Sequence, residues 1–164
     1  MLRELGFWCS EEELSTQELL DVGRPNPVLL VDDAWFAECD PSFMDKVEWY
    51  LTQGAFVESH ELAYSFCRFS DCSLAMEQPR VMGACTMTDG FYCWPEGYWH
   101  YVKHHHVKPP QEFLDHLLER YDTMVEMTAE KRLWLWDELE QKAVGMPRAM
   151  QEWITNYTTI QVDP

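Results

Sequence analysis

The fold is decided by one stretch of the chain, Thr88-Asp89-Gly90-Phe91-Tyr92-Cys93-Trp94-Pro95-Glu96-Gly97. Asp89-Gly90 separates two runs of β-forming residues and is typical of a two-residue type I′ turn, which needs positive φ at both positions. The sequence therefore predicts a hairpin with strands over residues 81–88 and 91–94. Pro95 is predicted to open a helix that ends before Lys108-Pro109-Pro110, because a proline at the first helical position lacks only an N–H that has no partner there.

Outward from the hairpin, Leu62, Tyr64 and Phe66 alternate with smaller residues, which predicts a neighbouring strand over residues 62–69. Residues 70–79 are expected to form a loop. Residues 28–31 are apolar and are expected to form a short buried strand or an extended segment.

Helices are predicted on both flanks from their caps. Ser10 and Glu13 form a capping box for a helix that ends at Gly23, and Asp40 with Pro41 starts a second helix that ends at Gly54. Further helices are predicted from Pro110, over residues 128–143 and over residues 149–157. The predicted fold class is α+β: a small antiparallel sheet with its hairpin at Asp89-Gly90, several helices packed against it, and a helical C-terminal third.

The chain has 164 residues and a net charge of −17, and its length is that of one domain. The single domain, 1–164, is expected to have three parts. An acidic helical part over 1–58 has net charge 3 − 13 = −10, and a nearly neutral part over 59–108, with the sheet and the Trp-Pro-Glu-Gly helix, has 4 − 5 = −1. The helical part over 109–164 has 5 − 11 = −6.

The charge argues against two classes of partner. Nucleic-acid binding requires clustered Lys and Arg, and the longest basic feature is Lys131-Arg132, so no nucleic acid is expected. A membrane partner is not expected either, since no apolar run approaches the length of a span and anionic surfaces would repel the chain. Without a recognisable secretory signal, the six cysteines are expected to be reduced, and the protein cytoplasmic or nuclear.

The central segment resembles a family of small uncharacterised proteins, many of them bacterial. Their motif reads T-D-G-x-x-x-W-P-E-G, then H-Y-V, then P-x-E-F, and it is matched here by residues 88–97, 100–102 and 110–113. Cys67-Arg68 matches an upstream pair, so the resemblance covers roughly residues 65–115. Tyr98 departs from the pattern, as does the run of three histidines from His104. The resemblance implies a shared fold and no catalytic residue, because the family has no established activity.

One candidate binding site is the corner between the last strand and its helix. Trp94 is expected to anchor the helix to the sheet, while Asp89 and Glu96 line one rim of the sheet. Arg68 on the neighbouring strand could pair with either acid, or hold a carboxylate or phosphate bidentately. A purely structural corner is the alternative interpretation.

A second candidate is a zinc site. Glu96, His100 and His104 follow one another at intervals of four residues, so they would stack on one helix face, and histidines four apart can share a metal. Zinc needs further ligands, for which Cys67, Cys72, Cys85 and Cys93 are possible donors; Cys67 and Cys93 are the two selected. The alternative is a solvated face that binds no cofactor.

Three functions follow from these patterns. The leading prediction is a small non-catalytic interaction protein whose acidic surface binds a protein, most simply a basic one. The second is a metal-binding protein that uses the central His and Cys residues. The third is a cysteine-dependent enzyme, for example with Cys67 or Cys93 beside His100, although no nucleophile elbow, phosphate loop or H-E-x-x-H motif is present. The partner's identity and the oligomeric state are not predicted.

Overall fold

The computed structural model describes residues 2–10 and 24–139. The predicted helix after Ser10 and the predicted helix over 149–157 lie outside the described residues. So does the end of the predicted helix over 128–143.

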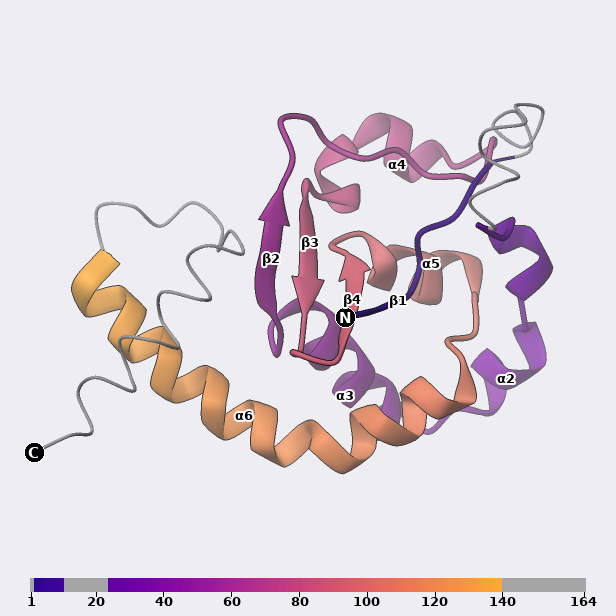
Figure 1. The fold of residues 1–164 in the computed structure, drawn as a ribbon. Helices are drawn as coiled ribbons and strands as arrows, with labels where there is room; N and C mark the ends of the chain where they lie inside the picture. Colours follow the sequence, from indigo (N-terminus) through magenta and orange to yellow (C-terminus); the bar gives the residue numbers. More distant parts are fainter. Residues whose placement is uncertain (1, 11–23, 140–164) are drawn as a thin grey trace, which may run out of the picture.

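The described strands form one four-stranded sheet in the order β1-β4-β3-β2 (Figure 1). Its members are β1 (Arg3–Glu4), β2 (Phe56–His60), β3 (Cys85–Thr88) and β4 (Tyr92–Pro95). The pairs β2–β3 and β3–β4 are antiparallel, whereas β1 pairs with β4 in parallel. The sheet is therefore mixed, because a segment from the start of the chain adds a parallel edge to the predicted antiparallel strands.

The predicted hairpin is present, but its turn is shifted by one residue. Thr88 pairs with Cys93, and Asp89 N–H donates to the Tyr92 carbonyl, so the two loop residues are Gly90 and Phe91. Gly90 has φ of 91°, and it is the one residue of the turn with positive φ. A glycine at the first loop position, followed by a residue with negative φ, fits a type II′ turn, so the type I′ prediction was wrong.

Two further strand predictions were wrong in position. The alternating residues 62–69 lie in a loop, and the strand before them is β2. The predicted strand over 81–88 begins only at Cys85, after a 3-10 helix over Pro79–Met82. Residues 28–31 do not join the sheet: Pro27–Leu30 is another 3-10 helix, and Val31 makes an isolated antiparallel bridge with Val107.

Asp32 and Asp40 cap the first N–H groups of two described helices, whereas the helices that follow Cys72 and Gly97 have no side-chain cap. The carboxylate of Asp40 accepts the N–H of Ser42 at the start of α3 (Pro41–Thr52), as predicted. A short α2 (Asp33–Glu38) precedes it, and α4 (Ser73–Glu77) interrupts the predicted loop. Pro95 ends β4 rather than opening a helix, and α5 (Tyr98–His105) begins after Gly97.

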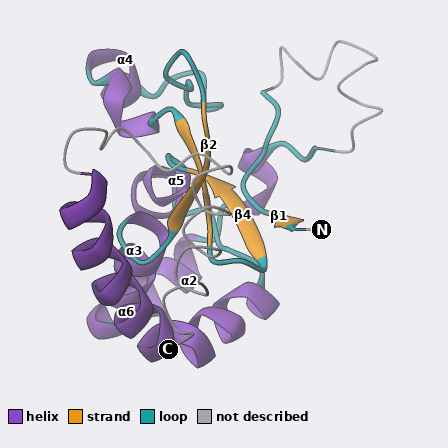
Figure 2. Cartoon of the chain, turned by 60° about the vertical axis from the view of Figure 1, so that its left-hand side comes forward, coloured by secondary structure: helices purple, strands orange, loops and turns teal. Residues whose placement is uncertain are grey.

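The last described helix, α6 (Gln111–Leu139), is continuous where two helices were predicted. It packs against α3 and passes the end of the sheet that carries the β3–β4 turn (Figure 1). Figure 2, which views the sheet from its side, shows α3 and α5 beside the strands. In the part of the chain that the structure describes, no helix combines the length and apolar composition of a bilayer span.

One hydrophobic cluster joins the sheet to these helices. It includes Tyr50 and Leu51 of α3, Trp94 of β4, Val102 of α5 and Phe113 of α6, all with at most 2% exposure. A mixed sheet covered by helices, with a helical segment at the end, confirms the predicted α+β class.

Candidate metal centre

Four metal-ligating side chains come together beside the sheet: Cys67, Cys72, His100 and His105. Their ligand atoms all lie within 4.8 Å of one another. The Cys67 Sγ is 3.4 Å from His105 Nε2, and the Cys72 Sγ is 3.4 Å from His100 Nε2. These are two thiols and two imidazoles around a single point.

The spacing of these atoms fits a tetrahedral zinc ion. Zn–S bonds of about 2.3 Å and Zn–N bonds of about 2.0–2.1 Å place sulfur and nitrogen ligands about 3.5 Å apart at the tetrahedral angle. Both measured S···N distances, 3.4 Å, are close to that edge length. Two thiolates would also neutralise a divalent ion, so a filled site would carry no net charge into this buried region.

The four ligands come from two segments that pack directly on each other. The cysteines bracket the loop 67–72, with Cys72 at the start of α4, and the histidines lie five residues apart on α5. The Phe69 ring stacks on the His105 ring with centroids 3.9 Å apart and planes 8° from parallel. The backbone N–H of Arg68 donates to the Tyr101 Oη at 2.8 Å. These contacts hold the loop against the helix at the position that a shared ion requires.

Burial favours the neutral imidazoles that a metal needs. His100 is 4% exposed, and burial, together with His105 and His104, lowers its pKa to about 4. The pKa of His105 is lowered by burial and then by His104. Both rings are therefore unprotonated at neutral pH and have a lone pair available.

The Cys67 thiol responds to burial in the opposite direction. Burial raises the pKa of Cys67 to about 12. Without an ion this cysteine is a thiol, and only a metal would stabilise its thiolate. At this pKa Cys67 lacks the ready thiolate of a cysteine nucleophile, and a bound metal would have to displace the thiol proton.

The structure brings together two of the four residues that sequence analysis selected as zinc ligands. Cys67 and His100 belong to the group, whereas Cys93 and His104 lie outside it. Cys93 is buried in β4, and His104 is an exposed residue of α5.

The four grouped residues follow the pattern C-x4-C and then H-x4-H, which falls within the usual ligand spacings of structural zinc sites. It was missed because Glu96 was placed on the same helix as the histidines, which selected the four-residue interval. The structure places Glu96 before α5, where its Oε2 accepts the backbone N–H groups of Ala84 and Cys85 at 2.8 and 3.1 Å.

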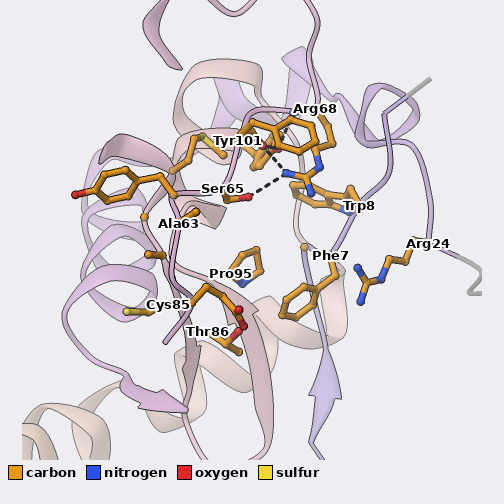
Figure 3. Close-up of a pocket in the computed structure, with 17 residues that line it drawn as sticks. Phe7, Trp8, Arg24, Ala63, Ser65, Arg68, Cys85, Thr86, Pro95 and Tyr101 are labelled. Carbon is orange, nitrogen blue, oxygen red and sulfur yellow. Dashed lines mark hydrogen bonds between the residues drawn. The ribbon is translucent and has the colours of Figure 1, made fainter. Parts of the chain in front are cut away.

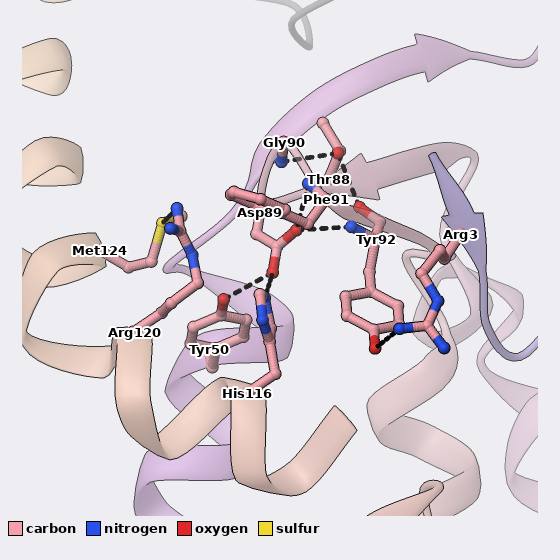
Figure 4. A network of polar contacts seen from close by, with 10 residues as sticks. All are labelled: Arg3, Tyr50, Thr88, Asp89, Gly90, Phe91, Tyr92, His116, Arg120 and Met124. Atoms are coloured by element: carbon pink, nitrogen blue, oxygen red, sulfur yellow. Dashed lines mark hydrogen bonds and ion pairs between the residues drawn. The ribbon is translucent and has the colours of Figure 1, made fainter. Parts of the chain in front are cut away.

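The predicted acidic rim is not formed, because its two carboxylates lie at opposite ends of β4. Asp89 is 5% exposed, and its carboxylate contacts α3 and α6 rather than Glu96 (Figure 4). Its Oδ2 accepts from Tyr50 Oη at 2.6 Å and from His116 Nε2 at 2.8 Å, and its Oδ1 accepts the N–H groups of Phe91 and Tyr92. Asp89 thus ties the turn to α3 and α6.

The two other predicted corner residues also have defined places. Trp94 is fully buried, and its indole N–H donates to the Leu51 carbonyl at 3.0 Å, so it anchors the sheet to α3. Arg68 lies on the loop between β2 and α4, where it donates to Ser65 Oγ at 3.0 Å and to the Phe66 carbonyl.

A separate Cys–His pair joins the end of β2 to the start of β3. His60 Nδ1 is 3.0 Å from the Sγ of Cys85, and sequence analysis did not single out this pair. Burial, followed by the Glu96 carboxylate, raises the pKa of Cys85 to about 11. A thiol with that pKa is mostly protonated at neutral pH, so the pair does not have the activated thiolate of a cysteine nucleophile.

Comparison of the chain with family models, with curated proteins and with solved structures finds no match. Function is therefore inferred from the geometry of the site itself.

Proposed function

We propose that the protein is a zinc protein in which Cys67, Cys72, His100 and His105 hold one ion. The convergence of four soft ligand atoms within 4.8 Å carries this proposal. Two sulfur and two nitrogen ligands in tetrahedral spacing favour zinc over calcium or magnesium, which take oxygen ligands.

The ion proposed here has a structural role. Catalytic zinc sites keep one position open for water or substrate, whereas structural sites use four protein ligands. Here all four ligands come from the chain, and they join the loop 67–72 to α5. Zinc would therefore fix that loop, as a disulfide does in an oxidising compartment, which agrees with the expected cytoplasmic or nuclear location.

Metal analysis of protein purified without a polyhistidine tag tests this proposal. We expect about one zinc per chain and, after exchange with cobalt, the visible absorption of a tetrahedral thiolate complex. Cys72→Ser and His105→Ala should abolish binding, whereas the matched variants Cys93→Ser and His104→Ala should retain it. Wild-type protein without metal, or equal loss in His104→Ala and His105→Ala, would contradict the proposed ligand set.

Recognition of a basic protein is a second proposal, which a different observation favours. The chain carries 29 acidic and 12 basic residues, and such a surplus steers positively charged partners. Pull-downs at low and high salt test it, since screening shortens the range of exposed charges to about 10 Å at 0.1 M. Captured basic proteins should be released by salt; capture that does not respond to salt would contradict a steered contact.

A further inference from the structure

A cavity of about 420 Å³ lies next to the proposed metal centre, bounded by the segment after β1, the loop after β2 and the end of β4 (Figure 3). Aromatic side chains form much of its wall, among them Phe7, Trp8, Phe66 and Tyr101. Its volume lies within the range of small-molecule sites, about 300–1,000 Å³. The cavity is therefore large enough for a ligand with one or two rings.

The charge of this cavity is opposite to that of the chain. Arg24 and Arg68 line it, and Glu61 is the one acid among its described lining residues. In a chain with 12 basic and 29 acidic residues, two guanidinium groups at one cavity are a marked local excess of positive charge. An arginine pair in a partly enclosed site favours an anionic ligand, because the fork of N–H donors matches carboxylate and phosphate oxygens.

Both guanidinium groups rest on aromatic rings that hold them in place. The Cζ of Arg68 is 3.8 Å from the centroid of Phe66, and the Cζ of Arg24 is 5.5 Å from that of Phe7. The Nε of Arg24 is buried and has no hydrogen-bond partner among residues 2–10 and 24–139. A buried donor atom without an acceptor is costly, so its place beside a cavity favours an acceptor that is not among the described residues, and a bound anion would supply one.

We propose that this cavity binds a small aromatic anion. Its ring would lie among Phe7, Trp8 and Phe66, and its carboxylate or phosphate would accept hydrogen bonds from Arg24, with Arg68 adding positive charge. Aromatic walls favour a flat ring through offset or edge contacts, while the arginines select for charge.

The cavity shares a wall with the metal centre, but Arg24, the proposed main donor to the anion, lies outside the two segments that carry the metal ligands. Arg68 follows the ligand Cys67, and its N–H is bonded to Tyr101, which lies between the two ligand histidines on α5. Titrating zinc-loaded and chelated protein in parallel separates the two proposals. Binding in both forms supports the cavity whatever the metal result.

Calorimetric titration with three related probes tests the inference: 2-naphthoate, 2-naphthyl phosphate and neutral 2-naphthalenemethanol. We expect at least one anion to bind about tenfold or more tightly than the alcohol, which corresponds to about 1.4 kcal/mol for the charged contacts. A preference for naphthoate or for the phosphate identifies which anionic group the site takes.

Variants place the binding at this cavity. Arg24→Gln should reduce the affinity for the preferred anion to that for the alcohol, whereas Arg80→Gln, an exposed residue outside the cavity lining, should leave it unchanged. Melting curves test whether both variants fold. If Arg24→Gln does not fold, the ratio of the wild-type affinities for the anion and for the alcohol tests the proposal. Equal affinity for anion and alcohol, no binding of either anion at several millimolar, or unchanged affinity in folded Arg24→Gln would overturn the proposal.

Discussion

Replacing Asp89 with alanine should lower the free energy of unfolding by about 3–5 kcal/mol. The carboxylate is buried and accepts four hydrogen bonds, at 2.6 Å from Tyr50, 2.8 Å from His116, 2.8 Å from Phe91 N and 2.7 Å from Tyr92 N. Its removal leaves buried donors without an acceptor, at about 1–3 kcal/mol each, and this loss is partly offset because the carboxylate no longer has to be dehydrated. The result is a large fraction of the 5–15 kcal/mol that stabilises a typical domain.

Urea unfolding at constant zinc concentration measures this loss. The comparison requires that the slope of the unfolding free energy against urea concentration is the same in the variant and the wild type. Asp115→Ala is the matched control, because Asp115 is exposed on the same helix as His116, and its loss should be within about 0.5 kcal/mol. Tyr50→Phe should cost about 1.5–3 kcal/mol in the wild type and close to zero beside Asp89→Ala. A loss below about 1 kcal/mol for Asp89→Ala, or equal costs of Tyr50→Phe in both backgrounds, would refute the role of the carboxylate.

Three further outcomes are expected. Chelating zinc should lower the melting temperature by roughly 5–10 °C, because an ion at a hundredfold excess over its Kd stabilises the folded state by about 2.7 kcal/mol; superimposable melting curves would contradict a bound structural ion. Gly97→Ala should destabilise the protein by about 1–3 kcal/mol in urea unfolding, because an added Cβ would lie 2.7 Å from the Met82 carbonyl oxygen. An unchanged urea concentration at half unfolding would show that the structure relaxes around the added methyl group. Iodoacetamide should alkylate Cys85 about 100-fold more slowly than an unperturbed thiol at neutral pH, because raising its pKa from 9.0 to about 11 removes most of the thiolate. Peptide mass spectrometry measures the rate, which should rise as the pH approaches about 11. Fast labelling of Cys85 at neutral pH would argue against the raised pKa.

Local signals in the sequence identified the elements whose start and end depend on neighbouring residues. The Asp89-Gly90 turn region and the Asp40–Pro41 start of α3 were predicted because turns and caps are local hydrogen-bonding choices. The second strand was misplaced because its pairing is not local. The alternation of residues 62–69 resembles a strand, yet Leu62 is fully exposed, while the less apolar β2 pairs with β3 across a register shift between Val57 and Ser59.

Sequence analysis selected two of the four residues of the candidate metal centre as ligands, and it selected different partners for them. His100 was selected together with His104 because histidines four residues apart can share a metal, and Cys67 was one of the central cysteines offered as a further ligand. His104 shares a helix face with His100 wherever the helix begins, so the four-residue interval could not select His105. The structure starts the helix after Gly97 and brings the 67–72 loop onto it through Phe69 and Tyr101, and neither contact has a signature in sequence spacing.

The parallel edge strand β1 has a practical consequence for work on this protein. It is two residues long and is attached to β4 through hydrogen bonds from Arg3 N to the Phe91 carbonyl and from Leu5 N to the Cys93 carbonyl. Phe7 and Trp8 follow it directly into the wall of the aromatic cavity. Deleting the first eight residues would leave the backbone N–H and C=O groups along one side of β4 unpaired, so that other chains could pair with this strand. It would also remove the rings of Phe7 and Trp8. Purification tags are therefore better placed at the C-terminus.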